Sequence, residues 1–200
     1  MTAASDLQIP GYVAGTWVID PVHSHVGFVI KHMMVSKVRG RFGTFSGQIV
    51  TAENPLDSSA TATIEATSID TDNEMRDNHI RSADFFEVEH HPQITFASTG
   101  VRFEGDEFFL DGDLSIRGTT KPVTLTVEDP AFGPNPMGGT KAGFSATTEI
   151  NRMDFGVSYN GPIPGGGVAL GEKVQIVLDV EADLVTDSGT GDGGAATNAS

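Results

Sequence analysis

The chain has 200 residues, of which 38% are hydrophobic and 20% are charged, and this composition fits one soluble domain with a sizeable core. Its 27 acidic residues outnumber the 12 basic ones, and the resulting formal charge of −15 argues against nucleic acid as a partner. The absence of cysteine excludes disulfides and thiolate chemistry, and because no apolar run approaches the roughly 20 residues of a membrane-spanning helix, we expect no membrane insertion.

The two ends of the chain differ from its body. Residues 1–14 are of mixed character, and we expect either a flexible segment or a strap packed across the fold through Ile9 and Tyr12. This start lacks a basic flank followed by an apolar segment, so we expect a cytoplasmic protein, or a secreted one only if a signal was trimmed away. Residues 186–200 contain no large apolar side chain and are predicted to be a disordered tail. The folded domain is therefore predicted to span residues 15–185.

An alternation of apolar and polar residues runs through the predicted domain, and this period of two is typical of half-buried β-strands. In the first clear case, Val26, Phe28 and Ile30 share one face of a strand. Most connections are short and carry turn residues, which favours antiparallel order. We therefore predict an all-β antiparallel barrel of eight or nine strands. The predicted strand regions are 16–19, 25–31, 38–52, 60–69, 94–97, 110–117, 123–128, 144–150 and 174–184.

One segment departs from this pattern. The sequence Thr71-Asp72-Asn73-Glu74 has the spacing of a capping box, which predicts a short helix from there to about Arg81. Asp77 and Arg81 are four residues apart, so we expect them to pair on the exposed side of this helix. Phe85 and Phe86 follow it, and we expect them to form a plug that closes one end of the barrel.

Phenylalanine is the strongest compositional clue to the interior. The 12 Phe residues far outnumber the two Tyr and one Trp, so most aromatic area lacks a polar group and belongs in an apolar interior. A barrel of about eight strands either is filled by side chains or holds one small ligand. Strands of ten residues are about 33 Å long before tilt, a length that suits an extended hydrocarbon chain. The Pro- and Gly-rich segments 129–139 and 160–171 are predicted to be loops at the lips of the opening.

Six histidines raise an alternative of another class. His23 and His25 share a strand face, and His90 and His91 are neighbours, so a histidine cluster at the barrel rim would be the metal site of a metal-dependent enzyme. No HExxH motif and no GxSxG motif occurs, and we therefore predict no metal site, no catalytic residue and no enzymatic activity. The metal-dependent enzyme stays as the alternative.

Charged residues among apolar ones form a further group. Arg152 and Asp154 follow one strand, and Arg76, Asp77 and Arg81 belong to the predicted helix. Because buried charges are usually paired, we expect a structural ion network that fastens the helix to the barrel. The alternative is that these charges hold the polar headgroup of a ligand.

Four segments of the chain resemble successive signatures of the YceI-like family. They are residues 15–47, 75–98, 111–125 and 150–157, and they include RDNHIRSADFF and RGTTKPV. The resemblance implies an extended, lipocalin-like, eight-stranded antiparallel barrel with a short helix near one end. It also implies an apolar tunnel that binds polyisoprenoids or other amphiphiles, quinones among them.

Taken together, these features predict a protein that binds and carries or stores a long apolar isoprenoid or lipid-like chain, such as a polyprenyl chain or a quinone, in the barrel interior. We expect this apolar small molecule as partner, no cofactor other than such a lipid, and a homodimer as the oligomeric state. The predicted ligand-binding residues come from the alternating strands and the segments between them. They are Phe28, Ile30, His32, Phe42, Phe45, Ile94, Phe96, Leu114, Ile116, Phe144, Ile176 and Leu178.

Overall fold

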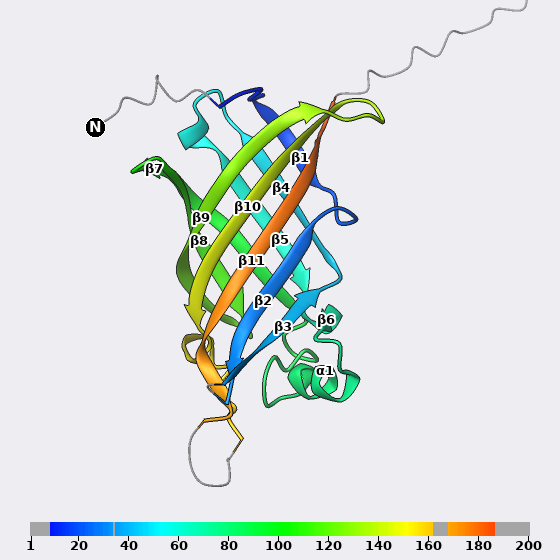
Figure 1. The fold of residues 1–200 in the computed structure, drawn as a ribbon, viewed down its shortest axis with the longest axis vertical. Helices are drawn as coiled ribbons and strands as arrows, with labels where there is room; N and C mark the ends of the chain where they lie inside the picture. Colours follow the sequence, from blue (N-terminus) through cyan, green and yellow to red (C-terminus); the bar gives the residue numbers. More distant parts are fainter. Residues whose placement is uncertain (1–8, 34, 162–167, 187–200) are drawn as a thin grey trace, which may run out of the picture.

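The computed structural model describes residues 9–33, 35–161 and 168–186, and they form a tall barrel of β-strands with one short helix beneath it (Figure 1). The helix is α1 (Glu74–Arg81), and three short 3-10 turns are η2 (Pro55–Asp57), η3 (Ala66–Ser68) and η4 (Arg152–Phe155). The strands are β1 (Gly15–Ile19), β2 (His25–His32), β3 (Ser36–Phe42), β4 (Phe45–Thr51), β5 (Ser59–Glu65), β6 (Ile69–Asp70), β7 (Gln93–Glu104), β8 (Glu107–Ile116), β9 (Thr119–Pro134), β10 (Thr140–Asn151) and β11 (Leu170–Leu184).

The barrel is closed, and all its strand pairs are antiparallel. Hydrogen bonds link β1, β4, β5, β7, β8, β9, β10 and β11 in that order, and β11 then pairs with β1. Strand β2 continues the line of β1 along β11, while β3 continues β4 along β2, and β6 continues β5 along β3. Eight strand positions result, so the predicted eight-stranded antiparallel barrel with a short helix near one end is confirmed. The predicted long strands 38–52 and 60–69 are each divided in two, at residues 43–44 and at η3.

The alternation read from the sequence sets which side chains enter the barrel. On β10, for example, Phe144, Ala146, Thr148 and Ile150 point inward, and Lys141 lies on the outer wall beside its cross-strand partner Asp183. A small core fills the upper end of the barrel, where Trp17, Ala142 and Ala182 are at most 1% exposed. A larger set of buried residues, which includes Ile69 and Phe155, surrounds the interior toward α1. The two ends are therefore packed differently.

The start of α1 differs from the predicted capping box. The N-cap is Asn73, whose side chain accepts a hydrogen bond from the backbone N–H of Arg76. Thr71 instead donates its hydroxyl to Oδ1 of Asp77, which is only 6% exposed. The expected surface pair of Asp77 and Arg81 is wrong for the same reason, because Asp77 turns inward and Arg81 donates to the backbone carbonyls of residues 67 and 69.

The described residues of the two predicted loops lie at opposite ends of the barrel (Figure 1). Residues up to Pro134 belong to β9, so the predicted loop 129–139 is wrong over its first half. Phe132 explains the difference, because its ring packs against Trp17 with ring centroids 5.5 Å apart and holds the backbone extended. In the other segment β11 already begins at Leu170, and residues 162–167 lie outside the described residues.

Several expectations about the ends and the assembly stay predictions. Residues 1–8 and 187–200 lie outside the described residues. These two ranges include most of the predicted flexible segment and most of the predicted tail. Within the described part, Tyr12 donates its hydroxyl to the carbonyl of Ala52 and packs edge-on against Phe132. The homodimer is untested by a single chain. In the part of the chain that the structure describes, no helix has the length and apolarity needed to cross a membrane.

Candidate functional site

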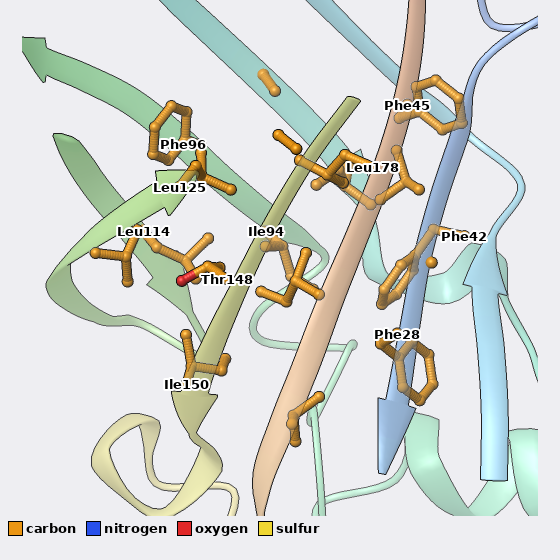
Figure 2. Close-up of a pocket in the computed structure, with 18 of the residues that line it drawn as sticks. Phe28, Phe42, Phe45, Ile94, Phe96, Leu114, Leu125, Thr148, Ile150 and Leu178 are labelled. Carbon is orange, nitrogen blue, oxygen red and sulfur yellow. The ribbon is translucent and has the colours of Figure 1, made fainter. Parts of the chain in front are cut away.

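The interior of the barrel is hollow below the Trp17 core. A cavity of about 560 Å³ opens there, which falls within the range of roughly 300–1,000 Å³ typical of small-molecule sites. Side chains from strands all around the barrel point into it, among them Phe28, Phe96 and Leu125 (Figure 2). The wall is overwhelmingly apolar, so the cavity suits a molecule that prefers hydrocarbon to water.

All twelve residues predicted to bind a ligand lie along this cavity. They come from β2, β3, β4, β7, β8, β10 and β11, and the barrel brings them together from positions up to 150 residues apart, Phe28 and Leu178 being the two extremes. Their contact with a ligand stays a prediction. The reason for their shared location is the register of antiparallel strands, in which every second residue faces the same side.

Two glycines shape the wall by making room for aromatic rings. A Cβ added at Gly40 would lie only 2.4 Å from the ring of Phe28, and one added at Gly112 would lie 2.4 Å from the ring of Phe96. Real Cβ atoms do not approach other atoms so closely, so each ring lies across its glycine and not further into the barrel. Part of the free volume of the cavity therefore depends on these two positions.

The cavity also contains residues that the sequence did not single out as a site. Val123, Leu125 and Val127 of β9 share the inward face that alternation had already suggested. Phe85 and Phe86, predicted as a plug, both reach the cavity wall near α1. Other lining residues carried no signal, because they belong to irregular segments that only the fold brings beside the barrel. These include Val157 and Tyr159.

Arg152 is the most unusual polar residue of the cavity wall. It follows β10 in the inward register and is only 5% exposed. Its Nε donates to the carbonyl of Gly171 (2.9 Å), and its Nη1 donates to the carbonyls of Val157 (2.5 Å) and Tyr159 (3.0 Å). Nη2 is shielded from water and has no hydrogen-bond partner among the described residues. Burial lowers the pKa of Arg152, because the guanidinium has lost its water.

The helix adds polar groups at the same end of the cavity. Arg76 lines the cavity, and its Nε and Nη2 donate to the hydroxyl and the carbonyl of Thr71. The ring of His79 lies edge-on to the ring of Tyr159, with centroids 4.9 Å apart, and its Nε2 is 2.8 Å from Oδ2 of Asp84. The α1 end therefore combines an apolar interior with several hydrogen-bond donors.

The expected ion network between helix and barrel is wrong in its chemistry. In the described part of the chain, no carboxylate lies within ion-pairing distance of Arg152, and Arg76 and Arg81 are held mainly by Thr71 and by backbone carbonyls. One ion pair that does link this region to the barrel joins Arg117 to Glu87, with 3.3 Å between Nη2 and Oε2, and another joins Arg41 of β3 to Asp70 shortly before α1. The arginines bond to backbone carbonyls and not to the expected carboxylates. These carbonyls are available because the irregular segments around η3 and η4 leave them without a strand partner.

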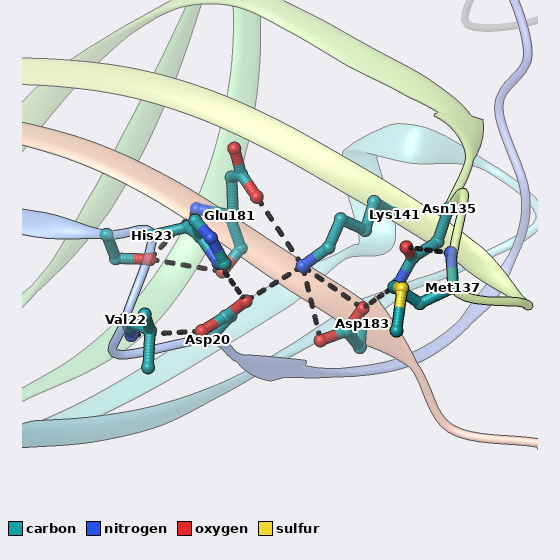
Figure 3. A network of polar contacts seen from close by, with 9 residues as sticks. Asp20, Val22, His23, Asn135, Met137, Lys141, Glu181 and Asp183 are labelled. Carbon is teal, nitrogen blue, oxygen red and sulfur yellow. Dashed lines mark hydrogen bonds and ion pairs between the residues drawn. The ribbon is translucent and has the colours of Figure 1, made fainter.

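The histidines of the metal alternative do not converge on one site. Among the described residues, the group with ligand atoms close enough for a metal ion is Asp20, His23 and Glu181, and it includes neither His25 nor His90 nor His91. The carboxylates of this group already pair with a cationic side chain. Nζ of Lys141 lies 2.9 Å from Oδ2 of Asp20 and 3.4 Å from Oε2 of Glu181 (Figure 3). The geometry therefore does not favour a metal-dependent enzyme.

Comparison with known proteins finds related sequences over most of the chain. Residues 17–182 match the family model described as the YceI-like domain. The UPF0312 protein SERP2314 of Staphylococcus epidermidis is 43% identical over 167 residues, which cover 82% of this chain and 95% of the relative. The protein YceI of Escherichia coli O157:H7 is 39% identical over 161 residues, which cover 80% of this chain and 81% of the relative.

Solved structures share the same barrel. The YCEI protein of Campylobacter jejuni aligns with a TM-score of 0.68 at 28% identity, over 89% of this chain and all of that one. A domain from Saccharophagus degradans, described as polyisoprenoid-binding, aligns with a TM-score of 0.60 over 86% of this chain and all of that one. Its identity is 16%, so this second likeness concerns the fold alone.

Proposed function

The chain belongs to the YceI-like family, and from this premise we propose that it binds and carries or stores a long apolar isoprenoid or lipid-like chain in the barrel interior. The observation that carries the proposal is the hollow, almost wholly apolar cavity of about 560 Å³. Protein interiors are normally packed without such voids, so an apolar space of this size inside a stable barrel is best explained by an occupant.

The shape of the site supports an elongated occupant. Strand β10 has 12 residues, which corresponds to about 40 Å along the strand before its tilt is taken into account. Lining residues occur from Tyr12 near the upper end to Arg152 near α1. The description of the Saccharophagus degradans domain as polyisoprenoid-binding supports a polyisoprenoid as the first class of ligand to test.

Transfer of the chain out of water provides the driving force. Each buried methylene contributes about 0.8 kcal/mol, which is roughly a fourfold step in affinity before the cost of ordering the ligand is subtracted. Affinity should therefore rise with chain length until the ligand fills the cavity. Binding of this kind requires no catalytic residue.

The first experiment asks what the protein carries in its host. The full chain is purified from its host under mild conditions and examined by native mass spectrometry, followed by organic extraction and lipid analysis. We expect one class of long-chain isoprenoid or lipid-like molecule at near-stoichiometric amounts. Repeated recovery of empty protein that also fails to bind polyprenols, quinones and fatty acids would overturn the proposal.

A matched pair of variants locates the binding site. Ala146 and Thr147 are neighbours on β10, but Ala146 lines the cavity and Thr147 lies on the opposite face. We expect Ala146→Trp to fill the cavity and weaken binding of a fluorescent polyene or of farnesol by at least about tenfold, and Thr147→Trp to leave it nearly unchanged. Circular dichroism and thermal unfolding establish that both variants fold. Equal affinity in the two folded variants would place the ligand outside the barrel.

A further inference from the structure

The charge of the cavity wall is opposite to that of the whole chain. The protein carries 27 acidic residues, yet in the described part of the chain no Asp or Glu lines the cavity. The ionisable wall residues able to carry positive charge are instead Arg76, Arg152, His32 and His79. Asp77 is buried behind the wall, where it bonds to Thr71, and Asp84 pairs with His79, but neither carboxylate lines the cavity. A wall that contains arginines and no carboxylate is suited to negative charge.

These four residues gather at one end of the barrel. His79 and Arg76 belong to α1, and Tyr159 connects the helix to Arg152, since its ring contacts His79 and its carbonyl accepts from Nη1 of Arg152. His32 ends β2 at its pairing with Leu170, close to where Arg152 holds the carbonyl of Gly171. The upper end of the cavity, near Tyr12, has no charged lining residue in the described part. The wall residues able to carry positive charge therefore lie at the α1 end, and the rest of the described wall is uncharged.

The structural contacts of Arg152 do not use its whole side chain. Three carbonyls accept from Nε and Nη1, and these bonds hold η4 against the start of β11. They leave Nη2 without a hydrogen-bond partner among the described residues, and no carboxylate there lies within ion-pairing distance of the guanidinium, although Glu172 is near enough to interact with its charge. An unpaired buried donor on a charged group is costly, so an arginine kept in this state points to an acceptor that arrives from outside the chain.

Arg117 shows what a purely structural arginine at this end looks like. It donates Nη1 to the carbonyl of Gly156 and Nη2 to the carbonyl of Ala83, much as Arg152 does with its carbonyls. Unlike Arg152, it also pairs with the carboxylate of Glu87 and does not line the cavity. The two residues differ in two ways: only Arg152 has a donor without a hydrogen-bond partner among the described residues, and only Arg152 lines the cavity.

From these observations we infer that the ligand carries an oxyanion headgroup, a phosphate or a carboxylate, and that this group binds at the α1 end with an oxygen accepting from Nη2 of Arg152. The headgroup displaces the atoms that now shield Nη2, and Arg76 adds positive charge at the same end of the cavity. The apolar chain then extends upward toward Tyr12. This inference rests on the proposed function and narrows it from any apolar chain to an anionic amphiphile.

The test compares ligands that share a chain and differ in the headgroup. Farnesyl phosphate is compared with farnesol, and palmitate with 1-hexadecanol, by isothermal titration calorimetry on the full chain below the micelle concentration of each. We expect each anion to bind roughly 10- to 100-fold more tightly than its alcohol, as for one hydrogen bond between charged partners. Equal affinities within a pair would overturn the headgroup inference and leave chain binding in place. No binding by any of the four would overturn the proposed function as well.

Two variants assign the preference to one residue. In Arg152→Gln we expect the ratio of anion to alcohol affinity to fall to within about threefold of unity, because the anion then loses the charged donor that the alcohol does not need. In Arg117→Gln, the matched control, we expect the ratio to be unchanged. A preference that survives in folded Arg152→Gln would overturn the assignment.

A spectroscopic measurement does not depend on any variant folding. Arginine side-chain ¹⁵N resonances of the wild-type chain are followed during titration. We expect the Arg152 resonances to shift with farnesyl phosphate and to stay nearly fixed with farnesol, because only the phosphate accepts from the guanidinium. The same response to both ligands would indicate a purely structural arginine and overturn the inference.

Discussion

The cationic side chains at the two ends of the barrel have different kinds of partner. At the upper end, on the outer wall, Nζ of Lys141 lies 2.9 Å from Asp20, 3.2 Å from Asp183 and 3.4 Å from Glu181 (Figure 3). The hydrogen bond to Asp20 raises the pKa of Lys141, and Lys141 in turn holds the pKa of Asp20 well below its usual range. At the α1 end, inside the barrel, Arg152 has only carbonyls as partners, and burial lowers its pKa.

The two cations differ in how completely the chain itself pairs them. The Lys141 cluster, defined here as Lys141 with Asp20, Glu181 and Asp183, joins the turn after β1 to β10 and β11 and is complete within the chain. It stands beside the filled Trp17 core. Arg152 is incomplete and stands beside the hollow part of the barrel. The outer wall beside the Trp17 core therefore carries a complete network, whereas the cavity wall near α1 carries a buried donor without a partner in the described part of the chain.

The largest expected effect tests whether the upper end is packed and the lower part hollow. Trp17 is fully buried, and its Nε1 donates to Oγ1 of Thr51 at 2.8 Å. We expect Trp17→Ala to lower the free energy of unfolding by about 3–5 kcal/mol, measured by urea denaturation. Phe96→Ala on the cavity wall should cost less, about 1–3 kcal/mol, because one side of that ring already faces empty space. Equal costs would contradict the contrast between the two regions.

The next largest expected effect is the gain in stability when a ligand occupies the cavity. At a free ligand concentration of about 100 times Kd, binding to the folded state alone should raise the free energy of unfolding by about 2.7 kcal/mol. Thermal unfolding of the wild-type chain with and without farnesyl phosphate measures this gain. Ala146→Trp should show almost no gain, because its cavity is occupied by the new ring. An equal gain in that variant would mean that the ligand stabilises the barrel from outside.

A smaller effect concerns the completeness of the Lys141 cluster. We expect Lys141→Met to lower the free energy of unfolding by about 1–2 kcal/mol, because three carboxylates lose a shared partner that is itself largely covered. The matched control is Lys173→Met, which removes a single pair with Glu149 from a lysine side chain that is 76% exposed. That change should cost close to nothing. Equal effects of the two substitutions would show that the cluster adds nothing beyond an ordinary surface pair.

The smallest effect is a pH dependence at the edge of the same cluster. The hydrogen bond from His23 to Asp20 raises the pKa of His23 above its ordinary value. Because the folded-state pKa is the higher one, this stabilisation is present below about pH 6.5 and is lost as the pH rises through the raised value. We expect the difference in melting temperature between the wild type and His23→Gln to shrink between about pH 6 and pH 8. A difference that does not change with pH would contradict the linkage.

The sequence predicted the wall of the candidate site better than its polar end. Alternation placed Phe28, Ile94 and Leu178 on inward faces, because the side-chain period of a strand is a local property of its backbone. The same alternation continues from Ile150 to Arg152, so the inward direction of this arginine was also readable. Its partners were not readable, since the carbonyl of Gly171 approaches it only after β10 and β11 have paired.

Local polar chemistry was predicted less well than strand faces. The spacing of Thr71 and Glu74 satisfied the rule for a capping box, yet Asn73 caps the helix and Thr71 bonds to Asp77. A short polar side chain near a helix start has several partners within reach, and their relative energies differ by about 1 kcal/mol or less. The path of the backbone from β6 to α1 decides which partner each side chain meets. The pairing of β6 with β3 sets this path.

The barrel itself was therefore determined by the sequence, because the alternation, the turn residues and the lengths of its strands are each encoded over a few neighbouring residues. Only the tertiary structure decided that the barrel is hollow. Free volume is the difference between the space enclosed by eight strand positions and the summed side chains of all of them, so no single segment encodes it. The open donor on Arg152 is decided in the same way, because a missing partner can be recognised only after every nearby segment has taken its place.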